Sequence, residues 1–175
     1  MAEERVASYA DALFSVTRSE PERHRIEHEL FQLARALEGN EELRTSLADP
    51  NIPLPRRLQV VDELLGSGGH PVTVGCVSLI VAGELGGRLP AVVDALVDHS
   101  ARSAGREVAI VRSAIELTAD QQQRLAAALA TSLGREVDVR VVLDPAVLGG
   151  IVTEVGDTVI DGTVRHRLNQ LRDAF

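Results

Sequence analysis

The sequence predicts an α+β protein, with an N-terminal six-helix bundle followed by a small C-terminal α/β domain of order β-α-β-β-β-α. Up to about residue 105, apolar residues recur every three or four positions, which is the spacing of helices. Beyond that point, short apolar runs alternate with polar residues, as they do in strands. A chain of 175 residues has room for two small domains. We therefore expect a helical domain over residues 1–105 and an α/β domain over residues 106–175.

The first helix is expected at residues 5–17, RVASYADALFSVT, and its apolar surface is wide. A stripe of roughly 100° is enough to dock a helix on a core, whereas two neighbouring stripes here cover about half of the circumference. One stripe consists of Val6, Tyr9, Leu13 and Val16, and the other of Ala7, Ala10 and Phe14. Either the helix is deeply inserted, or one stripe faces the core and the other faces a partner.

Three helices are expected between residues 19 and 65. Ser19 followed by Glu22 is a capping-box pattern that predicts the start of the second helix, and Gly39-Asn40 predicts its end. A short third helix is expected at residues 41–48. Apolar residues repeat at helical spacing in the second and fourth helices: Ile26, Leu30, Leu33 and Leu37, then Leu54, Leu58, Val61 and Leu65. Each of these two helices therefore has one face for the core.

The next two helices differ in pattern. The sixth keeps its large apolar residues on one face: Leu89, Val92, Val93, Leu96 and Val97. The fifth, VTVGCVSLIVAGEL from Pro71 onward, is apolar nearly all round. That pattern predicts burial of the fifth helix on every side.

The C-terminal domain is expected to begin with the strand EVAIVRSAIEL at residues 107–117. Thr118 and Gln121 form a second capping-box pattern, which predicts a helix that ends at Gly134. Leu125, Leu129 and Leu133 align on this helix, and Val137, Val139 and Val141 alternate with polar residues in the strand that follows. Because a strand–helix–strand crossover joins parallel strands, these two strands should pair in parallel.

The remaining elements are two short strands and a helix. IVTEV and TVI are joined by Gly156-Asp157, which predicts a hairpin. Gly149-Gly150 allows close backbone approach where the chain enters the sheet. A last helix is expected at residues 163–174, after Asp161-Gly162, with Asp161 or Thr163 as its cap. This glycine-rich segment is therefore interpreted as architecture.

Composition excludes several classes of protein. The net charge is −8, all 18 basic residues are arginine, and aromatic residues make up only 2%. A nucleic-acid binder needs positive charge and ring faces, so no nucleic-acid partner is expected. The single cysteine, Cys76, excludes an internal disulfide and lies in an apolar run, so it is interpreted as a core residue. No signal peptide and no apolar stretch of about 18 residues is present, so any membrane association goes through a partner.

Residue patterns give little indication of chemistry. The glycine-rich segments lack the lysine of a phosphate-binding loop, and the acids of the C-terminal hairpin do not follow EF-hand spacing. His24 and His28 share a helix face at metal-ligand spacing, but Arg25 stands where a zincin motif has its glutamate. We therefore expect no catalytic residue, cofactor or metal site.

Four segments resemble, in order and spacing, the delta subunit of bacterial F-type ATP synthases, whose mitochondrial relative is the oligomycin-sensitivity conferral protein. They are YADALF at 9–14, LGGRLP at 85–90, SAIELTADQQQRL at 113–125 and DPAVLGGIVTEVGDTVIDGTVRHRLNQL at 144–171. Leu148 stands where isoleucine is usual, and Thr163 where serine is usual. Both departures keep size or capping ability.

The resemblance implies a stator subunit that performs no chemistry and sits at the cytoplasmic face of the cell membrane, attached only through the complex. In the family, the helical domain sits on the catalytic head and holds the N-terminal helix of an alpha subunit between its first and fifth helices. The small domain engages the peripheral-stalk b subunits, so that the head resists the proton-driven rotor. Candidate contacts to the alpha-subunit helix are Tyr9, Ala10, Phe14, Val77, Ile80 and Val81. Met1 just ahead of the first helix suggests a free-standing subunit.

Two alternatives stay open at this point. A small regulatory module could bind a metabolite through the Gly149-Gly150 and Gly156-Asp157 turns. An enzyme could use Cys76 as its nucleophile. A ligand that raises thermal stability would support the first alternative, and loss of activity in Cys76→Ala would support the second.

Overall fold

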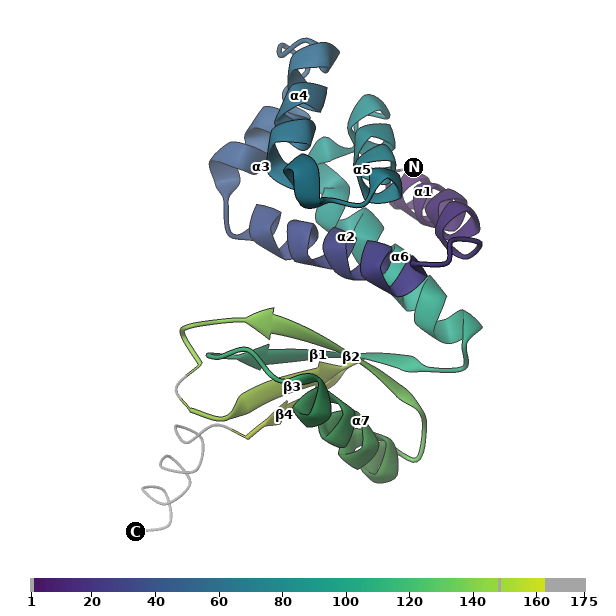
Figure 1. Ribbon diagram of the computed structural model, residues 1–175, viewed down its shortest axis with the longest axis vertical. Coiled ribbons are helices and arrows are strands. Elements are labelled where there is room, and N and C mark those ends of the chain that lie inside the picture. The colour runs from purple at the N-terminus through teal and green to yellow at the C-terminus, as the bar shows by residue number, and fades with distance from the viewer. Residues whose placement is uncertain (1, 148, 163–175) are drawn as a thin grey trace. The chain divides into compact units, whose positions relative to one another are not determined.

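The computed structural model describes residues 2–147 and 149–162 and divides into two compact units, Met1–Ser100 and Ala101–Phe175 (Figure 1). Helices make up the first unit, and a four-stranded sheet with a helix makes up the described part of the second. The predicted α+β class is therefore confirmed. No helix described here has, by itself, both the length and the apolar character of a membrane span; α5 and the segment Gly86–Ser103 reach them only if counted together across a bend of 117°.

Six α-helices account for most of residues 2–103. They are α1 (Ala2–Thr17), α2 (Arg23–Glu38), α3 (Glu41–Ala48), α4 (Leu54–Leu65), α5 (Pro71–Ala82) and α6 (Leu89–Ser103), with short 3-10 helices η1 (Gly66–Gly68) and η2 (Gly86–Arg88) before the last two. Each α-helix contributes at least one almost fully buried apolar side chain: Leu13, Leu30, Leu47, Val61, Ile80 and Leu96. The predicted apolar face of α2 is buried along its length, whereas in α4 only Val61 of the predicted face is buried and Leu54 is 36% exposed.

The start of α2 differs from its prediction. The helix begins at Arg23, its N-cap residue Glu22 makes no side-chain capping bond, and the Ser19 hydroxyl donates instead to the Val16 carbonyl at 3.0 Å. The predicted capping box is therefore wrong. Ser19 still lies in the turn that ends α1, where carbonyl groups lack helical partners and compete for its hydroxyl.

The segment LGGRLP fixes η2 against α3. A methyl group added at Gly86 would overlap the carbonyl of Leu47, the last buried residue of α3. Such close approach of two backbones is open only to glycine. The glycine therefore serves packing between elements of this unit.

The sheet of the second unit has the strand order β2-β1-β3-β4. Its elements are β1 (Glu107–Ser113), α7 (Ala119–Leu133), β2 (Val137–Leu143), β3 (Ile151–Val155) and β4 (Thr158–Asp161). As the crossover predicts, β1 pairs with β2 in parallel, and it pairs with β3 in the antiparallel sense. Ala109 lies opposite both Val139 and Val155, and α7 covers this face with Leu129.

Local signals in this unit are confirmed where they fall on described residues. Thr118 Oγ1 accepts from the Gln121 N–H at 3.3 Å, and the Gln121 side chain accepts from the Thr118 N–H at 2.8 Å. Gly134 ends α7 with φ 70°. The first strand, however, ends at Ser113 rather than at residue 117. The helix predicted at residues 163–174 lies outside the described residues.

Candidate partner-binding site

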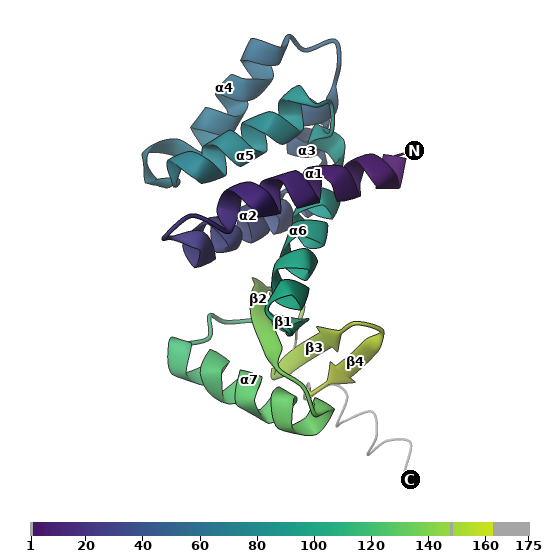
Figure 2. The ribbon, with the colours of Figure 1, turned by 90° about the vertical axis from the view of Figure 1, so that its right-hand side faces the viewer.

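Helix α1 lies beside α5 and also contacts α6 (Figure 2). Its buried side chains form one narrow stripe that takes members from both predicted stripes: Val6, Ala10, Leu13 and Thr17. Tyr9 and Phe14 are half-buried on the two sides of that stripe, and Val16 is 47% exposed. The helix is therefore docked by one side, and apolar surface is left over.

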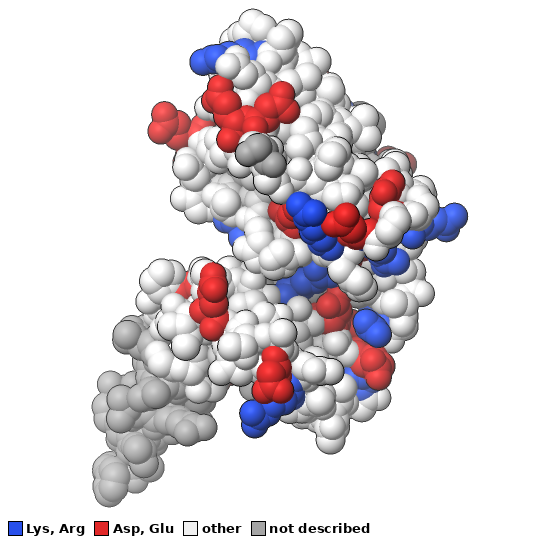
Figure 3. Space-filling model, in the orientation of Figure 1, with Lys and Arg blue, Asp and Glu red and all other residues white. Residues whose placement is uncertain are grey.

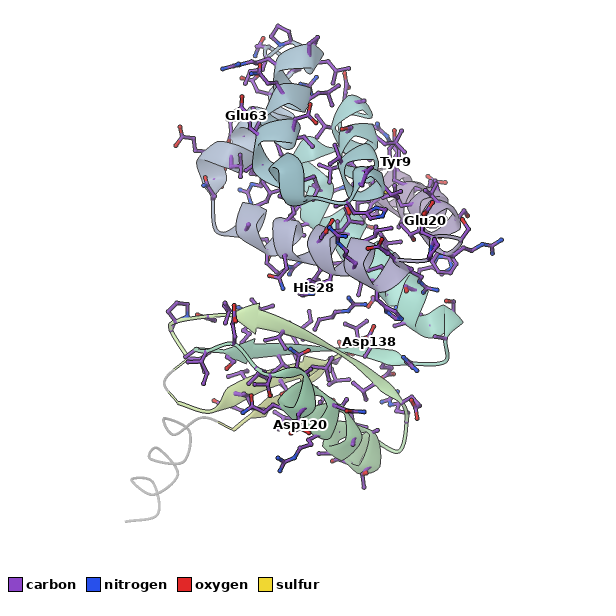
Figure 4. The ribbon with its side chains drawn as sticks, viewed as in Figure 1. Tyr9, Glu20, His28, Glu63, Asp120 and Asp138 are labelled. Carbon is purple, nitrogen blue, oxygen red and sulfur yellow. The ribbon has the colours of Figure 1, made fainter. Side chains whose placement is uncertain are left out.

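Tyr9 marks the side of α1 that meets α5 (Figure 4). Its hydroxyl fills the space beside Gly83, where any added methyl group would overlap it. One turn earlier, the Arg5 Nη2 donates to the Gly83 carbonyl at 2.8 Å. A side chain at position 83 would therefore displace the Tyr9 ring from its place against the end of α5.

Phe14 marks the other side of α1. Its ring stacks on His99 of α6, with centroids 4.3 Å apart, and the Arg23 guanidinium carbon lies 5.4 Å from its centroid. His99 Nδ1 lies 2.7 Å from Asp11 Oδ1 on the same helix as Phe14. Phe14 therefore joins α1 to α6 and α2, on the side of α1 away from α5.

Helix α5 is buried on one side only, so the prediction of burial on every side is wrong. Its buried residues are Thr73, Cys76, Val77, Ile80 and Val81, whereas Gly75 and Ala82 are exposed and Leu79 is 49% exposed. The helix contains no charged residue. An apolar helix without charges carries no periodic signal, so its sequence cannot indicate which side faces water.

Helical spacing relates the exposed apolar residues of the two helices to the point where Tyr9 meets Gly83. On α1, Ala12 and Val16 follow Tyr9 by three and seven residues, so they share its side of the helix. On α5, Leu79 and Gly75 precede Gly83 by four and eight residues, so they share the side that meets Tyr9. The exposed Ala82 follows Leu79 by three residues on α5. We call the set Ala12, Val16, Gly75, Leu79 and Ala82 the α1–α5 face.

Four of the predicted contacts to a partner helix are instead core residues of the chain. Ala10 is 2% exposed, and Val77, Ile80 and Val81 are fully buried. Their side chains pack inside the unit and are not available to a partner in this structure. Tyr9 and Phe14 remain partly accessible, but they lie on opposite sides of α1. Val16 and Leu79, which were not among the predicted contacts, are about half-exposed.

The N-terminal end of α5 is held by Glu29 of α2. Glu29 Oε2 accepts from the His70 N–H at 2.9 Å and from the Thr73 hydroxyl at 2.6 Å, and Oε1 accepts from Arg25 Nε at 2.9 Å. Burial by itself would raise the pKa of this carboxyl, but the hydrogen bonds from Thr73, His70 and Arg25 outweigh it and lower the pKa below its ordinary value. Both ends of α5 are thus attached to neighbouring helices.

Cys76, His24 and His28, which the sequence raised as a possible nucleophile and metal ligands, do not lie in environments that suit those roles. Burial, with a smaller contribution from the Glu20 charge, raises the pKa of the Cys76 thiol to about 11, which opposes a role as nucleophile. His24 and His28 are both exposed on α2, where Figure 4 labels His28. Within residues 2–147 and 149–162, no group of three His, Cys, Asp or Glu side chains could hold a metal ion. On the face shown in Figure 3, arginine and acidic side chains are interspersed among uncharged ones.

The glycine-rich signature lies along β3 and β4. Gly149 and Gly150 adopt φ values of 62° and 94° before β3, and Gly156 adopts 55° in the two-residue turn that Asp157 completes. Tight hairpin turns need a positive φ at their first central residue, so the predicted hairpin at Gly156-Asp157 is confirmed.

The described part of this segment ends just after the edge strand β4. Asp161 closes β4, and the Gly162 N–H donates to the Ile151 carbonyl at 2.9 Å. The capping role expected of Asp161 or Thr163 concerns a helix outside the described residues.

Comparison with known proteins identifies the family. Residues 6–175 match the family model described as "ATP synthase delta (OSCP) subunit". The chain belongs to this family. Among curated members, the "ATP synthase subunit delta" of Parafrankia sp. (strain EAN1pec) is 41% identical over 147 residues, which are 84% of this chain and 53% of that protein. The protein of the same name from Nocardia farcinica is 39% identical over 147 residues, 84% of this chain and 54% of that protein.

The chain thus spans about half the length of the curated family members that it matches. Its fold is similar to a chain in the cryo-EM structure of the Toxoplasma gondii mitochondrial ATP synthase hexamer. The TM-score is 0.58 with 24% sequence identity, over 97% of this chain and 96% of that chain. The two chains therefore share a similar fold.

Proposed function

We propose that this chain is a non-catalytic stator subunit of an F-type ATP synthase. It links the catalytic head to the peripheral stalk, so that the head resists rotor torque during ATP synthesis. Membership of the delta (OSCP) family supports this role. The raised pKa of the single thiol is consistent with a protein that does no chemistry.

In this proposal the two domains have separate partners. The six-helix bundle over residues 1–105 binds the N-terminal helix of an alpha subunit on the catalytic head. The small α/β domain over residues 106–175, with the order β-α-β-β-β-α, binds the peripheral-stalk b subunits. The chain is then peripheral at the cytoplasmic face of the cell membrane and reaches the membrane only through the complex.

The observation that carries the proposal is the open side of α5. An apolar helix without a single charge normally lies inside a core, yet Leu79 is half-exposed, as is Val16 of the neighbouring α1. An amphipathic helix laid on such a surface buries apolar anchors at helical spacing. A link that bears repeated load needs slow dissociation. We therefore expect a Kd near nanomolar, which corresponds to a binding free energy of about −12 kcal/mol.

The contact residues are revised accordingly. Tyr9 remains in the proposed set and is joined by Ala12, Val16, Leu79 and Ala82 of the α1–α5 face. Four of the earlier candidates have an indirect role, because their buried side chains fix the positions of α1 and α5: Ala10, Val77, Ile80 and Val81. Phe14 orients α1 against α6.

A synthetic peptide with the N-terminal sequence of the alpha subunit tests the proposal against the full chain. We expect it to slow hydrogen exchange in α1 and α5, and we expect Leu79→Asp to weaken its binding by about a hundredfold, because a charge is then buried against the helix. Leu64→Asp is the matched control, since Leu64 is 41% exposed on α4, away from this face.

Equal loss of affinity in the Leu79 and Leu64 variants would contradict the assignment of the face. So would protection confined to residues 106–175. Thermal unfolding of both variants checks that the helical unit stays folded.

A further inference from the structure

Gly75 is the only glycine inside an α-helix in the described parts of the chain. A glycine in a helix interior is less stable than alanine because the unfolded chain loses more conformational freedom. Gly75 lies in the middle of α5, is exposed, and a methyl group added there would meet no atom within 4 Å. The fold of this chain would therefore accept alanine at position 75 without any clash.

Two other glycines show what close packing within the fold looks like. A methyl group at Gly83 would overlap the Tyr9 hydroxyl, and one at Gly86 would overlap the Leu47 carbonyl. Both glycines sit where two elements of the unit approach closely. At Gly75, a turn and more away from the Tyr9 contact, an added methyl group would meet no atom of the described chain within 4 Å.

The position of Gly75 indicates what approaches it. It lies one turn before Leu79 on the exposed side of a helix that carries no charge. Two helices pack with axes 8–10 Å apart, and the shorter separations need small side chains at the crossing point. We infer that Gly75 is the point at which the partner helix crosses α5, with its backbone close to that of α5.

This inference rests on the proposed function and adds a requirement on the partner. The bound helix presents a small side chain to Gly75 and larger apolar side chains to Leu79 and Val16. Gly75 is then a specificity-determining residue, because any side chain at position 75 would hold the two helices apart.

The test compares Gly75→Ala, Gly75→Leu and the control Ala36→Leu in the full chain, with the alpha-subunit N-terminal peptide as the probe. Ala36 is exposed on α2, outside the α1–α5 face. We expect Gly75→Ala to raise the Tm by about 2–4 °C, because alanine is a better helix former than glycine. The same variant should raise the Kd for the peptide about tenfold, and Gly75→Leu about a hundredfold, because the added atoms overfill the contact. The control should bind as the unchanged protein does.

Unchanged affinity in Gly75→Ala, with the peptide still bound by the unchanged protein, would overturn the inference and leave the proposed function standing. A lower Tm in Gly75→Ala would overturn it as well, since the glycine would then serve this chain's own fold. Failure of the unchanged protein to bind the peptide would remove both the proposed contact and the inference. If Gly75→Leu does not fold, Gly75→Ala decides the question, because its methyl group meets no atom of the chain.

Discussion

Helices α5 and α6 are both rich in valine and leucine, but they are held in different ways. The apolar face of α6 is buried along its length, with Leu89, Val92, Val93 and Leu96 fully buried and Val97 2% exposed. Helix α5 is buried on one side, is attached to neighbours at both ends, and leaves Leu79 half-exposed. The difference teaches that charge marks the solvent side of a helix. Where charge is missing, only packing reveals which side is free.

The largest expected effect compares leucines from the two helices. Leu96→Ala in α6 should lower the free energy of unfolding by about 2–5 kcal/mol, because it leaves a cavity in the core. Leu79→Ala in α5 should lower it by less than about 1 kcal/mol, because half of that side chain is already in water. Urea unfolding of both variants measures the contrast. Similar losses would show that the two helices are buried alike.

The second prediction concerns the C-terminal attachment of α5. Gly83→Ala should lower the free energy of unfolding by about 1–3 kcal/mol, because its methyl group overlaps Tyr9. Gly83 has φ −78°, a value that alanine adopts readily, so backbone strain does not contribute. Adding Tyr9→Phe removes the overlapping hydroxyl and should recover part of the loss. A double variant as unstable as the sum of the single ones would show that the two residues do not interact.

The smallest effect concerns the N-terminal attachment and depends on pH. The folded-state pKa of Glu29 is lowered, so its stabilisation is fully present above the unfolded value of about 4.3 and is lost as pH falls through the folded value. Glu29→Gln should therefore cost about 1 kcal/mol at neutral pH. The gap to the unchanged protein should close in acid. A gap that stays constant from pH 7 to pH 3 would contradict this role for the carboxylate.

Much of the fold was predictable because its signals are local. The bounds of α3, the capping box of α7, the parallel pairing of β1 with β2 and the hairpin at Gly156 follow from spacing, capping and turn chemistry. The start of α2 was not predictable, because the Ser19 hydroxyl has two possible hydrogen-bonding roles. Its hydroxyl could cap α2, but it satisfies a carbonyl at the end of α1 instead.

The candidate site was less predictable, because it depends on contacts between distant residues. Within the YADALF segment the sequence does not separate core from surface, yet Ala10 is a core residue and Phe14 packs against α6. On α5 every residue type fits a core equally well. That Val77 is buried and Leu79 half-exposed therefore could not be read from the sequence.

The strand order of the sheet has a consequence for synthesis of the chain. The first strand made, β1, is an inner strand, and both of its neighbours, β2 and β3, emerge from the ribosome after it. Until residues 137–155 have been translated, both hydrogen-bonding edges of β1 are unpaired and could pair with other chains. Nascent chains stalled before that point should therefore depend on chaperones far more than chains stalled within the helical unit.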